Sequence, residues 1–285
     1  MRAFAYERPD RLADALALLA DLGPAARPLA GGTDLIIRIR DGSIRPTTVV
    51  DVKRIAELER EIRVEDGLLR IGARSTMTDL ERDERIRRDY LALAEAAAFV
   101  GSVQIRNRAT LAGNICNASP AADTAPALLV YDARVVAVGP SGRRTIPLDA
   151  FFVKAGVTTL EPEELVEAIE MPLPAGPRGA VHARRTRRRG HDLASVTLAC
   201  SIGNDGVTRL SYGSVGPRPV LVVDETGLLA DPRATDLAKS ARLEELFAAA
   251  APSPTSMRAS PEYRRAMLRV LGTRAVASAM ERLAS

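Results

Sequence analysis

Residues 109–126, ATLAGNICNASPAADTAP, hold almost no side chain that could act as an acid, a base or a nucleophile. Small residues let a backbone approach another group closely, and N–H groups that a tight turn leaves free can bind an anion. Residues 30–34, AGGTD, have the same character. If the fold brings residues 30–34 and 110–114 together, their backbone donors form a concave nest able to hold a pyrophosphate.

Length and composition describe an ordinary globular protein of one large or two ordinary domains. The chain has 285 residues, of which 46% are hydrophobic and 27% charged, which excludes a disordered or collagen-like chain. No apolar run reaches the roughly 18 residues of a membrane-spanning helix. The amino-terminal MRAFAYERPD lacks the apolar core of a signal peptide. We therefore expect a cytoplasmic protein with no membrane span.

Metal and nucleic-acid sites are not expected in this chain. Two cysteines, Cys116 and Cys200, with two histidines, are too few for a zinc or iron–sulfur site, so we expect free buried thiols. Tryptophan is absent and aromatic residues make up 4%, too few for a stacking platform on single-stranded nucleic acid. The arginine-rich run at 184–189 is typical of a solvated face.

The order of predicted elements indicates an α+β fold. A helix is expected from Leu12 to Gly23 with Asp10 as its N-cap, then a strand through Leu29, a glycine turn and a helix opened by Thr33 and Asp34. The other predicted elements are strands at 47–52 and 67–73, helices at 89–100, 125–133 and 261–284, a strand pair within 134–148, a strand ending near 172 and two strands within 194–215.

Neither common nucleotide-binding motif is present. The sequence has no G-x-G-x-x-G after the first strand and no G-x-x-x-x-G-K-[ST]. The second part of the chain combines antiparallel strands with helices, which argues against a doubly wound nucleotide fold. A cluster of prolines and glycines at 172–179 indicates a domain boundary.

Spaced motifs along nearly the whole chain resemble the FAD-binding subunit of the molybdenum hydroxylases, the family of xanthine dehydrogenases and carbon monoxide dehydrogenases. These motifs are LAGGTDL at 29–35, SVQIRNRATLAGNICNASPAADTAPALLVYDA at 102–133, LEPEELVEAIEMPLP at 160–174, RRTRRRGHDLASV at 184–196 and ASPEYRRAMLRVL at 259–271. They occur in the family's order.

The resemblance implies a fold and its domain boundaries. The first domain, 1–175, would be a vanillyl-alcohol-oxidase (PCMH)-type FAD-binding domain, with subdomains at about 1–55 and 56–175. The second, 176–285, would be smaller, with a three-stranded antiparallel sheet and helices.

The resemblance also assigns residues to FAD. Residues 30–34 would wrap the pyrophosphate and residues 110–114 would close over it from the other side. Ala112 stands where the family has a glycine, and its methyl group requires a negative φ. The residues assigned to FAD are Leu29, Ala30, Gly31, Gly32, Thr33, Asp34, Leu35, Thr110, Leu111, Ala112, Gly113, Asn114, Ser119, Asp123, Leu165, Val166 and Arg184.

Asp123 and Ser119 belong to the family's S-P-x-x-D element. The resemblance makes Asp123 an acceptor for the adenosine ribose, and a carboxylate suits a diol. The alternative is a helix N-terminal residue favoured by the helix dipole. Leu165 and Val166 would pack near the flavin ring, although taken alone they are ordinary core positions.

Arg184, Arg188 and Asp192 occupy the places of a Lys, Arg and Asp pattern in the family. A cation near the pyrimidine end of the isoalloxazine would stabilise the negative charge of the reduced ring. Arg184 is bulkier than lysine and stays protonated. We expect Asp192 to orient the arginines.

The implied function is electron transfer inside a larger enzyme. A large subunit would hold a molybdenum cofactor, a small subunit [2Fe–2S] clusters, and the FAD of this chain would pass electrons to NAD or another acceptor. No catalytic acid, base or nucleophile is predicted in this chain. Two alternatives stay open: a stand-alone flavin oxidase of the same superfamily, against which the short part after residue 180 argues, and a cofactor-free basic binding module.

Overall fold

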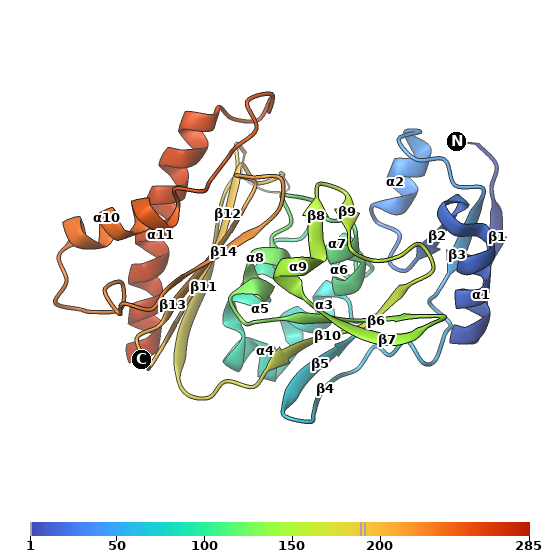
Figure 1. The fold of residues 1–285 in the computed structure, drawn as a ribbon, viewed down its shortest axis with the longest axis horizontal. Coiled ribbons are helices and arrows are strands. Elements are labelled where there is room, and N and C mark those ends of the chain that lie inside the picture. Colours follow the sequence, from blue (N-terminus) through green and yellow to red (C-terminus); the bar gives the residue numbers. More distant parts are fainter. Residues whose placement is uncertain (1, 189, 191) are drawn as a thin grey trace.

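A small parallel sheet opens the fold at one end of the molecule (Figure 1). The computed structural model describes residues 2–188, 190 and 192–285. The strands lie in the order β1–β3–β2, with parallel pairs, and α1 packs on β2 and β3. The elements of this subdomain are β1 (Ala5–Glu7), α1 (Leu12–Leu22), a 3₁₀ turn (Gly23–Ala25), β2 (Ala26–Leu29), α2 (Leu35–Arg40) and β3 (Thr48–Asp51).

Helix α1 forms for the reason that the sequence indicated. Leu12, Leu16 and Leu19 form one buried stripe, and Gly23, with φ of +50°, ends the helix. The predicted N-cap is wrong, because Arg11 and not Asp10 occupies that position, and it makes no side-chain cap bond.

The second subdomain is a five-stranded antiparallel sheet in the order β4–β5–β10–β6–β7. The β4–β5 turn places Asp66 and Gly67 at positive φ, as a two-residue hairpin requires. Its elements are β4 (Ile62–Glu65), β5 (Leu68–Gly72), α3 (Met77–Arg82), α4 (Glu84–Asp89), α5 (Leu91–Ala98), α6 (Val103–Arg106), α7 (Leu111–Cys116), α8 (Thr124–Leu129), β6 (Arg134–Gly139), β7 (Gly142–Pro147), α9 (Leu148–Phe151), β8 (Phe152–Lys154), β9 (Val157–Thr158) and β10 (Leu165–Pro172).

The carboxy-terminal part contains the expected antiparallel sheet, but with four strands and not three. The arginine-rich run begins in one strand, β11, and the apolar run at 220–224 forms another, β14, after a loop with two prolines. The elements are β11 (Arg178–Arg185), β12 (Val196–Gly203), β13 (Thr208–Gly213), β14 (Val220–Asp224), α10 (Asp236–Leu246) and α11 (Pro261–Ala284).

This four-stranded sheet lies between two sets of helices (Figure 1). Helix α11 packs on β11 and β12, while α5 contacts β11 and α8 contacts β12 and β13. The buried hydrophobic residues accordingly form two clusters, one centred on the five-stranded sheet and its helices and one between the four-stranded sheet and α10 and α11. Helix α5 therefore lies against β11, and α8 lies against the two middle strands, β12 and β13.

Both cysteines are unpaired thiols, as predicted. Burial raises the pKa of Cys116 to about 12 and raises that of Cys200 as well, so neither is a reactive thiolate at neutral pH. Across the described ranges, no helix is both long and apolar enough to cross a membrane. Within those ranges there is also no group of three metal-ligating side chains.

Candidate functional site

The first glycine turn, residues 30–34, lies directly against Arg108 and Ala109, the residues that lead into the second turn at 110–114. A Cβ atom placed on Gly31 would lie 2.1 Å from the carbonyl oxygen of Arg108 and 3.0 Å from the Cα atom of Ala109. Only glycine fits where the two backbones meet. Arg38 of α2 adds a second link by donating to the side-chain oxygen of Asn117 at 3.4 Å. The convergence expected from the sequence is therefore present.

The first turn offers a run of backbone donors. Among the residues that the structure describes, the N–H groups of Gly31, Gly32, Thr33 and Asp34 have no hydrogen-bond acceptor. Gly32 has φ of +77°, a left-handed conformation of the kind found in anion-binding nests. The turn is partly exposed and leads into α2, whose Ile36 N–H donates to the carbonyl of Gly32 at 3.1 Å. The first turn can thus bind an anion through its main chain.

The second turn is the start of helix α7 and not an open turn. Thr110 is the N-cap, and its hydroxyl accepts the N–H of Gly113 at 3.1 Å. Leu111 donates to the carbonyl of Ser75 and Asn114 to that of Thr110. Of the N–H groups of residues 111–114, only that of Ala112 lacks an acceptor within the described part of the chain. Capping therefore leaves fewer free donors here than predicted.

The helical position of Ala112 explains why its methyl group is tolerated. Ala112 lies in the first turn of α7 and is not among the residues with positive φ. The negative φ that an alanine requires in place of the family's glycine is therefore present. Its side chain is buried, 6% exposed, and packs in the first hydrophobic cluster.

The second turn continues into the S-P-x-x-D element. The hydroxyl of Thr124 donates to the side-chain oxygen of Asn114 at 2.6 Å, which ties α8 to α7. The Ser119 hydroxyl oxygen accepts the N–H of Ala121 at 3.3 Å, so it shapes the loop before α8. Asp123, the residue before Thr124, is therefore held next to the second turn.

Asp123 is buried, at 7% exposed, and faces β11. One carboxylate oxygen lies 3.0 Å from Nη1 of Arg184 and the other lies 3.2 Å from Nε2 of His182. Asp123 makes no side-chain bond that caps α8. The carboxylate thus links the start of α8 to β11 and does not act as a helix cap.

Both Nη atoms of Arg184 donate hydrogen bonds to protein oxygens. Arg184 donates to the carbonyl of Phe99 at 3.2 Å and to the carbonyl of Asp192, and its guanidinium lies 5.3 Å from the centre of the Phe99 ring. Carboxylate, carbonyls and ring together fix the direction of this cation.

Asp192 contacts two of the arginines around it. Besides its carbonyl bond to Arg184, its carboxylate lies 3.9 Å from Nε of Arg187. Burial acts to raise the pKa of Asp192, but Arg187 and the backbone N–H of Arg188 outweigh it and hold the pKa below its usual value. In the same loop, Arg189 and His191 lie outside the described residues.

The contact between Asp123 and Arg184 bears on two of the roles that the resemblance implies. The resemblance gives Asp123 the adenosine ribose and Arg184 the pyrimidine end of the isoalloxazine. In an extended FAD, the diphosphate and the ribityl chain separate those two groups. The 3.0 Å ion pair between the two residues favours placing both at the same end of the cofactor.

Leu165 and Val166 lie apart from these polar contacts. They begin β10, pair in register with Val138 and Ala137 of β6, and are both 6% exposed in the first hydrophobic cluster. Helix α7 packs on β10, which is the link between these residues and the second turn.

Three side chains at the site were not expected from the sequence: His182 and Phe99, which contact Asp123 and Arg184, and Glu95, which accepts the backbone N–H of His182. His182 gave no signal beyond being one of two histidines, and Phe99 ended a predicted alanine-rich helix. Only the packing of α5 on β11 brings these side chains together.

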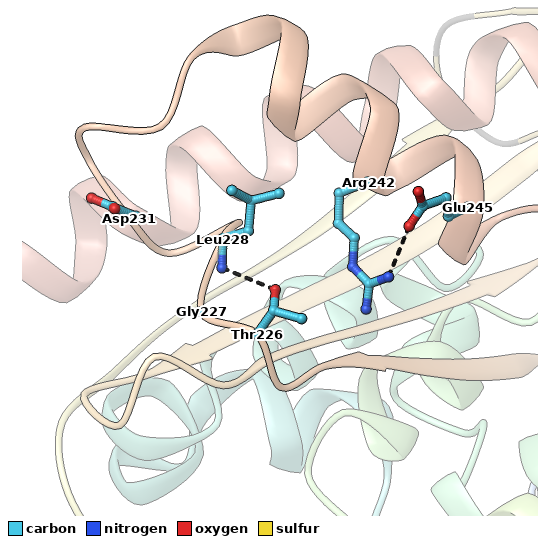
Figure 2. Close-up of a pocket in the computed structure, with 6 residues that line it drawn as sticks. All are labelled: Thr226, Gly227, Leu228, Asp231, Arg242 and Glu245. Carbon is cyan, nitrogen blue, oxygen red and sulfur yellow. Dashed lines mark hydrogen bonds and ion pairs between the residues drawn. The ribbon is translucent and has the colours of Figure 1, made fainter.

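A surface hollow in the carboxy-terminal domain is not part of this site. Figure 2 shows its lining, in which Arg242 pairs with Glu245 at 2.9 Å and the Thr226 hydroxyl accepts the N–H of Leu228 at 3.2 Å. Arg242 also pairs with Asp224. Its polar side chains are engaged by other protein groups, and none of the predicted FAD residues lines it.

Comparison with known proteins defines the class. The family profile described as the FAD binding domain in molybdopterin dehydrogenase matches residues 2–174, and that of the CO dehydrogenase flavoprotein C-terminal domain matches residues 182–279. The chain belongs to the family of FAD-binding subunits of molybdenum hydroxylases. It is an oxidoreductase subunit with FAD as its cofactor, and the predicted family and cofactor are confirmed.

Individual relatives agree with this assignment. The chain is 38% identical over 220 residues to the xanthine dehydrogenase FAD-binding subunit of Escherichia coli O157:H7, covering 75% of each. It is 31% identical over 285 residues to the carbon monoxide dehydrogenase medium chain of Hydrogenophaga pseudoflava, covering 99% of this chain and 98% of the relative. A solved carbon monoxide dehydrogenase from that organism, which lacks the Mo-pyranopterin moiety, matches with a TM-score of 0.91 at 30% identity, covering 99% and 98%.

Proposed function

We propose that this chain passes electrons from [2Fe–2S] clusters on a small partner subunit, through FAD, to NAD or another acceptor. A large partner subunit would hold the molybdenum cofactor and act on the substrate. The names of the relatives support this arrangement, since one is the medium chain of carbon monoxide dehydrogenase and another the FAD-binding subunit of xanthine dehydrogenase. Bound FAD supplies the chemistry, because a flavin takes electrons singly and gives them as a hydride.

The contact of the two turns at Gly31 carries the proposal. The free N–H groups of residues 31–34 suit a diphosphate, because backbone donors hold a phosphate without a fixed cation. Ala112 N–H and the Thr33 and Thr110 hydroxyls would add donors from both turns. The residues we propose for FAD are Leu29, Ala30, Gly31, Gly32, Thr33, Asp34, Leu35, Thr110, Leu111, Ala112, Gly113, Asn114, Ser119, Leu165, Val166 and Arg184, with Asp123 acting through Arg184.

We propose that Arg184 lies near the isoalloxazine ring of FAD and that Asp123 does not bind the adenosine ribose. Asp123 is only 7% exposed and each of its carboxylate oxygens already has a protein partner, which leaves little of the carboxylate accessible to a diol. The chain's own residues bind and orient the cofactor, with domains proposed at 1–175 and 176–285. The two free thiols support the cytoplasm as the compartment.

Two measurements test this function. The purified chain with added FAD should be yellow and retain flavin absorption after gel filtration, whereas a colourless protein would favour a cofactor-free binding module. Expressed with its neighbouring genes, the chain should co-purify with a molybdenum-containing subunit. A yellow chain that purifies alone and turns over substrate with oxygen would instead support the stand-alone oxidase.

Asp34→Asn is expected to strengthen FAD binding at neutral pH. The Asp34 carboxylate lies in the first turn, where it repels a diphosphate, and removing one charge there should gain about 1 kcal/mol, or about fivefold in affinity. Desolvation raises the pKa of Asp34, although Arg38 opposes this. The wild-type carboxyl therefore becomes neutral at a higher pH than usual, and the advantage of the variant should vanish on acidification. Fluorescence titrations at several pH values measure this, and a constant or absent advantage would place Asp34 away from the phosphates.

A further inference from the structure

His182 is a buried polar group for which the proposed function has no role. Its side chain is 0% exposed, and its Nε2 atom lies 3.2 Å from Asp123. Its Nδ1 atom is buried with no hydrogen-bond partner among the described residues. The ring lies beside Phe99, with 5.8 Å between ring centres.

This geometry selects one protonation form of the imidazole. An ionised carboxylate only accepts hydrogen bonds, so Nε2 must carry the proton that Asp123 accepts. A cationic ring would also carry a proton on Nδ1, and that charged donor would be buried without an acceptor. A neutral ring leaves only an unpaired acceptor there, which costs less. His182 is therefore the neutral Nε2–H form.

The surrounding charges agree with a neutral His182. Asp123, the residue before α8, faces Arg184 on β11, and Glu95 on α5 faces Arg282 on α11 at 2.7 Å. Glu95 also accepts the backbone N–H of His182 at 2.8 Å. Each carboxylate already has its own guanidinium, so neither leaves an unpaired negative charge beside the imidazole.

We propose that His182 is a positioning residue for the flavin, acting through Asp123 and Arg184. By occupying one carboxylate oxygen of Asp123, His182 leaves the other for a single bond to Arg184. The guanidinium then keeps the direction set by the Phe99 and Asp192 carbonyls. Without His182, both carboxylate oxygens of Asp123 could bind Arg184 and draw its guanidinium away from the isoalloxazine ring of the flavin. This inference rests on the proposed place of Arg184 at the flavin.

The protonation form can be measured without the cofactor. Because the sequence holds two histidines, a His191→Gln chain with ¹⁵N-labelled histidine gives imidazole signals from His182 alone. From the hydrogen-bond geometry we expect the neutral Nε2–H form at neutral pH. A cationic ring at neutral pH, or a proton on Nδ1 alone, would overturn the inference.

The positioning role is measured as the flavin midpoint potential. In His182→Leu, which has no donor, reduced flavin should lose about tenfold of its binding preference over oxidised flavin, a fall of about 30 mV for a two-electron couple. His182→Gln supplies an amide N–H and should restore most of this loss. Wild-type potentials in both variants, with only a lower unfolding temperature, would make His182 merely structural. A wild-type chain that retains no FAD would instead refute the proposed function.

Discussion

Gly31→Ala is expected to abolish FAD retention, with at least a hundredfold loss of affinity. The new Cβ would lie 2.1 Å from the Arg108 carbonyl oxygen, so the two turns must separate. Losing two hydrogen bonds to a charged diphosphate, at about 1.5 kcal/mol each or more, gives at least ~3 kcal/mol. Equilibrium dialysis or fluorescence titration with FAD measures the loss.

Gly42→Ala is the matched control. Gly42 lies in the same subdomain with φ of +80°, but a Cβ atom there meets nothing within 4 Å. Its left-handed backbone should cost about 1 kcal/mol of folding stability. FAD affinity should remain that of the wild type. Equal FAD affinities of the two variants would mean that contact between the turns is not needed for binding.

Asp123→Ala is expected to destabilise the cofactor-free chain by about 3 kcal/mol. The change leaves the guanidinium of Arg184, with only 11% of its side chain exposed, without its carboxylate, and breaking a buried ion pair typically costs this much. It also removes the acceptor of His182. Urea denaturation monitored by circular dichroism measures the loss, and Asp123→Asn should lose less because its amide oxygen can still accept from Arg184. An unchanged free energy of unfolding would show that the pair contributes nothing.

The same variant separates the two roles considered for Asp123. If the carboxylate acts through Arg184 at the ring end, Asp123→Ala should weaken FAD binding but leave ADP binding unchanged. A parallel loss of ADP affinity would return Asp123 to the adenosine ribose.

Elements with strong local signals could be predicted from the sequence. The strand, glycine turn and helix at 26–40 and the final helix, α11, are where the pattern placed them. The start of α7 was misjudged because a capping threonine followed by small residues resembles an open turn. Strand β14 was missed because its five residues pair only with a strand already formed.

The site could be predicted only in part, because its contacts are distant in the sequence. The residues of both turns follow from composition and resemblance, but the gap that only Gly31 fits depends on Arg108. The bonds from Asp123 to His182 and Arg184 span 59 and 61 residues. Hydrophobic periodicity does not predict contacts between residues so far apart in the sequence. The ion pair that bears on the ribose role of Asp123 was therefore visible only in the structure.

Hydrogen–deuterium exchange of the full chain, with and without FAD, tests most directly whether the two turns hold one diphosphate. The account predicts that the amides of residues 31–34 and of Ala112 become protected together when FAD binds, while residues 226–231 around the hollow of Figure 2 do not change. FAD binding that leaves either turn exchanging at its cofactor-free rate would contradict it.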